Sequence, residues 1–132
     1  MATRSFIARY NPETEMYESI YCHWDGYPQG VGVTLRDQYS HGDAPATLMT
    51  FGDISSLRDT LAETKAEAYK LRGDSDVDAK IFQFRSEMMN YYRGMSCEYG
   101  YLWRDGEWTC YALEPQEIDL YADHLTNEGI NV

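Results

Sequence analysis

The chain has 132 residues, of which 43% are hydrophobic and 14% aromatic, and it carries 22 acidic against 11 basic side chains. This length supports one hydrophobic core, so we expect a single domain over residues 1–132. The formal net charge of −11 disfavours direct binding to nucleic acid or to anionic membranes, and no apolar run is long enough to span a bilayer.

A first antiparallel hairpin is predicted over residues 5–24. Its first half places Phe6, Ala8 and Tyr10 on one face, as a half-buried strand does. Its second half, residues 16–24, alternates in the same way. The link between the halves, Asn-Pro-Glu-Thr-Glu, is typical of a turn.

Helices are predicted in the middle of the chain. A glycine-rich turn leads into a helix over residues 33–39, and a second apolar helix follows over residues 46–51. Asp53 has the position of an N-cap for a third helix, which we expect to reach Leu71 because apolar residues recur at helical spacing. The acidic run at residues 73–78 lacks the glycine and glutamate that an EF-hand calcium loop requires, so we predict no metal site there.

Residues 66–85 leave the choice between helix and strand open. The alternation at residues 82–85 favours a short fifth strand beside the second hairpin. Ser86 then has the position of an N-cap for a helix packed over the sheet.

The second hairpin is predicted over residues 98–113, because Asp105-Gly106 is a dipeptide that a tight turn with positive φ favours. A last helix is expected over residues 116–127, after Pro115. The predicted fold is therefore α+β. It has an antiparallel sheet of four to five strands, built from hairpins at about 5–24 and 98–113, with three to four helices packed mainly on one face.

Three cysteines are present, Cys22, Cys97 and Cys110. Their odd number and strand-like surroundings favour buried free thiols over a disulfide framework. The sequence has no CxxC or HxxxH spacing that would join them to the histidines as metal ligands. We therefore predict neither a metal nor a cofactor.

The most specific segment is Tyr-Cys-His-Trp-Asp-Gly-Tyr-Pro-Gln-Gly-Val-Gly at residues 21–32. A strand, a glycine-containing turn and a helix start in succession can bind an anion through free main-chain N–H groups. The Gly-Lys-Ser/Thr ending of a phosphate loop is missing, so nucleotide binding stays an alternative. The candidate binding residues are His23, Trp24, Asp25 and Tyr27.

Catalysis by this motif would use His23 as acid or base and Cys22 or Ser19 as nucleophile. Neighbours on a strand point to opposite faces, so Cys22 and His23 should diverge. We therefore name no catalytic residue. The motif is expected mainly to fold a strand into a helix.

The C-terminal end of the chain is strongly acidic. No basic residue follows Arg104, whereas seven acidic residues do. Two interpretations stay open: a solvated face that keeps the protein soluble, or a contact surface for a basic partner. The candidate contact residues are Glu114, Glu117, Asp119 and Asp123.

Four blocks of the sequence resemble a family of small tailed-bacteriophage and prophage proteins that share the motif YCHWDGYPxGVG. The matching blocks are residues 3–5, residues 20–32 with Leu35, residues 52–57 and residues 98–108. The resemblance implies a viral origin, and no established activity comes with it.

From this resemblance and the acidic charge we expect a phage-encoded accessory protein that binds and modulates or inhibits a host protein. A partner with a basic, nucleic-acid-binding surface would fit, with host takeover or anti-defence as the role. The start of the chain lacks a secretory signal pattern, so we expect it in the host cytoplasm. The alternatives are a small nucleotide-binding, ligand-binding or hydrolytic protein that uses residues 21–32, and a structural protein of the virion. The sequence leaves the oligomeric state open.

Overall fold

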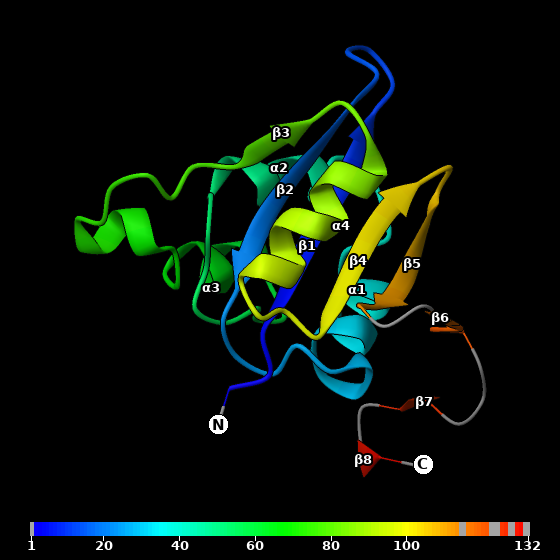
Figure 1. Cartoon of the computed structure of the whole chain (residues 1–132). Coiled ribbons are helices and arrows are strands. Elements are labelled where there is room, and N and C mark those ends of the chain that lie inside the picture. The colour runs from blue at the N-terminus through cyan, green and yellow to red at the C-terminus, as the bar shows by residue number, and fades with distance from the viewer. Residues whose placement is uncertain (1, 114–115, 122–124, 127–128, 131–132) are drawn as a thin grey trace.

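A six-stranded sheet of mixed direction forms the centre of an α+β fold (Figure 1). The computed structural model describes residues 2–113, 116–121, 125–126 and 129–130. In spatial order the strands are β3 (Lys80–Phe82), β2 (Met16–Cys22), β1 (Ser5–Asn11), β4 (Tyr99–Arg104), β5 (Glu107–Ala112) and β6 (Gln116–Ile118). Two short strands, β7 (Leu125–Thr126) and β8 (Gly129–Ile130), pair separately.

Both predicted hairpins are present. β1 and β2 pair antiparallel over their whole length, and β4 pairs with β5 across the predicted turn. Asp105 and Gly106 have φ angles of 56° and 81°, the left-handed conformation that a tight hairpin turn of this kind requires. Local turn chemistry therefore determines these two pairings.

A parallel pair joins the two hairpins, where an antiparallel sheet was expected. β1 lies between β2 and β4 and runs parallel to β4, from Ser5 opposite Tyr99 to Arg9 opposite Trp103. Parallel neighbours need a long crossover connection, and the whole segment between β2 and β4 supplies it.

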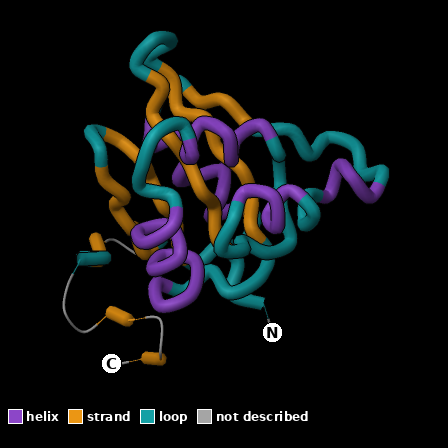
Figure 2. Tube along the Cα trace, turned by 180° about the vertical axis from the view of Figure 1, so that it is seen from behind, coloured by secondary structure: helices purple, strands orange, loops and turns teal. Residues whose placement is uncertain are grey.

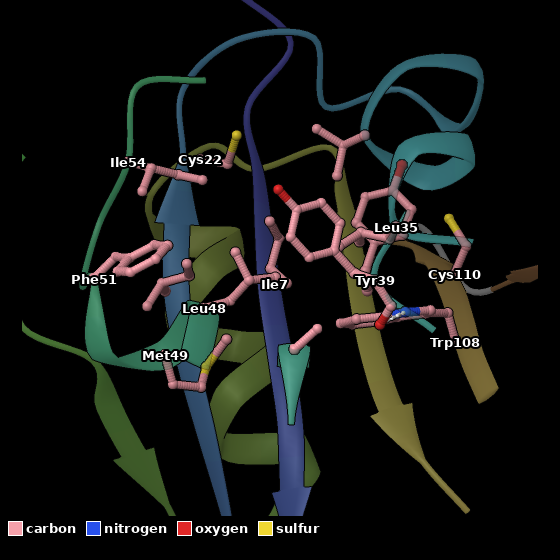
Figure 3. Packing of buried hydrophobic residues seen from close by; sticks show 14 of the residues in the cluster. Ile7, Cys22, Leu35, Tyr39, Leu48, Met49, Phe51, Ile54, Trp108 and Cys110 are labelled. Atoms are coloured by element: carbon pink, nitrogen blue, oxygen red, sulfur yellow. Dashed lines mark hydrogen bonds between the residues drawn. The ribbon is translucent and has the colours of Figure 1, made fainter. Parts of the chain in front are cut away.

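Helices cover both faces of the sheet (Figures 1 and 2). The elements on one face are η1 (Pro28–Gly32), α1 (Val33–Gln38) and α2 (Ala44–Thr50), and the element on the other is α4 (Arg85–Gly94). Ile7 packs in the first core, which Figure 3 shows, and its neighbour Phe6 packs in the second. No described helix is both long and apolar enough to cross a bilayer.

The prediction of one long third helix over residues 53–71 is wrong. Helical structure there is limited, among the described residues, to α3 (Leu61–Lys65) and the short η2 (Tyr69–Arg72). Ile54 instead forms a parallel bridge to Cys22 and is fully buried. Tertiary burial beside the end of β2 therefore overrides the helical spacing of the apolar residues.

Two predictions near the edges of the sheet also need correction. The helix predicted over residues 116–127 begins in the structure as strand β6. Leu120 is buried whereas Tyr121 is 49% exposed, so the apolar stripe of a helix is not formed. The short strand predicted over residues 82–85 lies earlier, as β3 at Lys80–Phe82, and α4 already begins at Arg85. β3 pairs with β2, at the edge opposite the second hairpin.

Gly100 lies where β4 passes the ring of Phe6, which stacks on Tyr92 with the ring centroids 4.6 Å apart. A Cβ at this position would collide with the Phe6 ring. We expect Gly100→Ala to lower the free energy of unfolding by about 1–3 kcal/mol, the usual range for overpacking.

Gly94 provides a matched control, because a Cβ there meets open space. Gly94→Ala should leave stability nearly unchanged. Urea denaturation measures both variants, and equal stability of the two would contradict the prediction.

Candidate functional site

The segment at residues 21–32 crosses the end of the sheet from β2 into η1. Gly26 packs against the first residues of the chain: its N–H donates to the carbonyl of Thr3 at 2.9 Å, and a Cβ would come within 2.7 Å of Ser5. The Gly26 carbonyl accepts the hydroxyl of Tyr101 at 2.6 Å. Close packing is therefore sufficient to explain this glycine.

His23 and Trp24, two of the four predicted binding residues, lie together at the wall of a cleft of about 450 Å³. Asp25 is exposed and Tyr27 is partly buried, and neither lines this cleft. The structure thus separates the predicted residues into a pair at the cleft and a pair outside it. The lining residues are Ala2, Arg4, His23, Trp24, Ser96 and Glu98.

Arg4 and Glu98 were missed by the sequence reasoning, and strand register explains their presence. Ser5 in β1 pairs with one residue of β2 and one of β4. Continuing this register by one residue beyond the strand ends places His23, Arg4 and Glu98 next to one another, and all three line the cleft. The main-chain N–H of Glu98 donates to the carbonyl of Arg4 at 2.8 Å, which continues the β1–β4 pairing by one residue.

The His23 ring is held by its neighbours. Its Nδ1 lies 2.7 Å from the hydroxyl oxygen of Tyr21, and its ring meets Trp24 edge-on with centroids 4.7 Å apart. Burial raises the pKa of Tyr21 to about 12, so this hydroxyl keeps its proton at neutral pH and is a ready donor. In the tautomer whose Nδ1 accepts this hydroxyl, the ring proton is on Nε2.

The charged groups of the cleft keep hydrogen-bonding capacity. Arg4 donates from Nη1 to the carbonyl of Met95 at 3.3 Å, which fixes the guanidinium near the loop after α4. Glu98 is exposed and takes part in no ion pair within the described part of the chain. One cleft therefore presents a guanidinium, an imidazole, a carboxylate and an exposed indole.

Neither predicted nucleophile is arranged for catalysis. Cys22 is buried in the core shown in Figure 3, on the face opposite His23, as the alternation predicts. Burial raises the pKa of the Cys22 thiol to about 12, so it stays protonated at neutral pH and is a poor nucleophile. The Ser19 hydroxyl is buried and lies 2.9 Å from the hydroxyl of Tyr92.

A second cleft, of about 350 Å³, lies along β5 and the chain after β6. Glu107 and Asp119 line it, both are exposed, and neither is ion-paired with any described residue. Tyr121 is half-exposed here; its N–H donates to Oδ1 of Asp119 at 2.9 Å, and its hydroxyl accepts the N–H of Trp108 at 3.2 Å. These bonds hold the chain after β6 against β5.

Of the four predicted acidic contact residues, Asp119 lies in this second cleft. Glu117 belongs to β6. Glu114 and Asp123 lie outside the described residues. Glu107 was missed as a contact residue, because its approach to Asp119 depends on the pairing of β6 with β5 in place of a helix.

Basic side chains are mostly engaged in internal contacts. Arg104 lies over the ring of Tyr10 at 3.9 Å, and Arg93 donates to the carbonyl of Leu113 at 3.0 Å. The ion pairs between described side chains are Arg9–Glu18, Arg36–Asp37, Arg58–Glu67, Arg72–Glu67, Lys70–Asp78 and Arg104–Asp105. Beside the second cleft, Arg36 donates from Nη1 to the carbonyl of Leu120 at 2.9 Å, but neither Glu107 nor Asp119 forms an ion pair with a described side chain.

No protein-family model matches this chain, and no curated protein or solved structure shows significant similarity to it. Among the described residues, no group of three or more histidine, cysteine, aspartate or glutamate side chains is placed to hold a metal ion. The two clefts and their chemistry are therefore the basis for a functional proposal.

Proposed function

We propose that this protein binds a basic surface of a partner protein through the second cleft. The observation that carries the proposal is one hollow in which two carboxylates, Glu107 and Asp119, lie beside the half-exposed ring of Tyr121 and form no ion pair with a described residue. Carboxylates attract arginine and lysine, and an aromatic ring beside them can stack on a guanidinium. The hollow thus offers both charge and shape to a basic side chain.

The formal net charge of −11 supports a partner of opposite sign. Long-range attraction speeds the encounter with a basic surface and repels acidic proteins. Basic surfaces are typical of proteins that bind nucleic acid, because the phosphate backbone is anionic. The proposed partner is therefore a nucleic-acid-handling protein whose binding surface the acidic cleft covers.

The sequence resemblance to tailed-bacteriophage proteins supports a host protein as this partner. On this proposal the protein is an accessory factor that acts in the host cytoplasm during infection. Covering the basic surface of a host enzyme would compete with its nucleic acid and reduce its activity. Enzymes of host defence are one class of target that carries such a surface.

Charge reversal at the cleft tests the proposal. We expect Glu107→Lys combined with Asp119→Lys to weaken partner binding roughly tenfold or more at low salt, because attraction becomes repulsion. The matched control combines Asp59→Lys with Asp74→Lys, two exposed acids away from β5 and β6. Both double variants change the formal net charge from −11 to −7, so a difference between them reports position.

The measurement is quantitative affinity capture from infected and uninfected host cells, followed by titration of the captured protein. A partner retained by the wild type and the control, and lost from the cleft variant, supports the proposal. Equal retention by all three proteins contradicts it.

A further inference from the structure

The first cleft, which His23 and Trp24 line, places hydrogen-bond donors and an acceptor side by side in a defined order. His23, Arg4 and Glu98 each lie one residue beyond the paired row of Cys22, Ser5 and Tyr99 in β2, β1 and β4, and all three line this cleft. Continuing the register by one residue gives the order His23, Arg4, Glu98. Adjacent strands lie about 4.8 Å apart, so the three groups are spread over the dimension of one planar heterocycle. We propose that this cleft binds the base of a free guanine nucleoside or nucleotide. The inference is independent of the acidic cleft along β5.

Glu98 supplies the acceptor. Guanine carries an N1–H and a 2-amino N–H side by side, and one carboxylate can accept both at once through its two oxygens. Glu98 is exposed and without an ion-pair partner among the described residues, so its oxygens are available to a ligand.

Arg4 and His23 supply the donors. Next to N1, the edge of guanine continues with the O6 and N7 acceptors, which arginine also contacts when it reads guanine in DNA. Arg4 occupies the middle of the row, opposite O6 when Glu98 holds N1. When Nδ1 of His23 accepts the Tyr21 hydroxyl, Nε2 carries the ring proton and can then donate to N7. The order of groups on the sheet therefore matches the order of groups on the base.

Trp24 supplies a surface for stacking. Its side chain is 45% exposed at the cleft, although tryptophan is usually well buried. A nucleobase that stacks on an aromatic side chain gains about 1–3 kcal/mol. The cleft volume of about 450 Å³ lies within the usual range for small-ligand sites.

The same row discriminates against other ligands. Adenine presents an amino group where guanine has O6, so a donor would face the donor Arg4. It also has an acceptor at N1, which would face the acceptor Glu98. Hypoxanthine lacks the 2-amino group and forms one bond fewer with Glu98. The net charge of −11 opposes phosphates, so the neutral nucleoside should bind at least as well as its monophosphate.

Calorimetric titration with guanosine, inosine, adenosine and guanosine monophosphate tests the proposal. We expect saturable guanosine binding, roughly tenfold weaker inosine binding and roughly ten- to hundredfold weaker adenosine binding. Trp24→Leu should weaken guanosine and adenosine alike, by roughly tenfold. Glu98→Gln should remove the preference for guanosine over adenosine. Asp25→Asn is the matched control outside the cleft and should leave that preference unchanged.

Several results would overturn the proposal. These are the absence of saturable guanosine binding at millimolar concentration, equal affinity of the wild type for guanosine and adenosine, and a preference for guanosine that survives in Glu98→Gln. Tenfold tighter binding of the monophosphate than of guanosine would show that phosphate is recognised in place of the base. The affinities of the wild type for guanosine, inosine, adenosine and guanosine monophosphate test the proposal even if a variant fails to fold.

Discussion

Replacing Trp108 with alanine should lower the free energy of unfolding by about 3–5 kcal/mol. Trp108 is 2% exposed and fills the space between β5 and the covering helices (Figure 3). Its indole N–H donates to the main-chain carbonyl of Tyr39 at 3.3 Å. The substitution therefore creates a cavity and leaves a buried carbonyl without its donor, and both effects act in the same direction.

Trp24 is the matched control, because its side chain is exposed at the rim of the first cleft. Trp24→Ala should change stability by no more than about 0.5 kcal/mol. Trp108→Phe should fall between the two alanine variants, since it keeps most of the packing and loses the hydrogen bond. Urea denaturation followed by circular dichroism gives all three values. A loss below 1 kcal/mol for Trp108→Ala would contradict the packing described.

Stability should also fall steeply between about pH 9 and pH 12. Burial raises the pKa of each of the thiols of Cys22, Cys97 and Cys110 from 9.0 to about 12. Above pH 9 the unfolded chain releases thiol protons that the folded chain retains, so the unfolded state is favoured as the pH rises. Each thiol removes about 1.4 kcal/mol of stability per pH unit in this interval and nothing below it.

Three such groups together approach the total stability of an ordinary domain before pH 12. We therefore expect cooperative alkaline unfolding, and urea midpoints that already decrease from pH 8 to pH 10.5. Cys97→Ala should reduce this decrease, because one of the three thiols with a raised pKa is absent. A midpoint that stays constant over the same interval would contradict the burial of the thiols.

The fold was predictable where the residues that determine an element are neighbours in the sequence. Asp105-Gly106 and the alternating residues around it determine a hairpin within sixteen residues, and that prediction is confirmed. Ile54 and Leu120 illustrate the opposite case. Their surroundings fit a helical spacing, but Ile54 bridges to Cys22 at the end of β2, and the buried side chain of Leu120 lies close to Gly32 in η1. Contacts distant in sequence therefore surround both residues.

The candidate sites divide in the same way. His23 and Trp24 stand out by composition, because an unusual cluster of aromatic and polar residues is visible in the sequence itself. Arg4 and Glu98 are ordinary charged residues in the sequence, and the pairing of β1 with β4 brings them into the cleft that His23 also lines. No spacing along the chain encodes that alignment.

The parallel pairing of β1 with β4 also has a consequence during synthesis. β4 is synthesised about ninety residues after β1, its parallel neighbour. At roughly 5–20 residues per second, one edge of β1 waits on the order of ten seconds for its neighbour. During that time the first hairpin exposes an open, apolar strand edge, which is a feature prone to aggregation. The β1–β4 pair can form only after translation has passed Arg104, so the two hairpins join later than either of them folds.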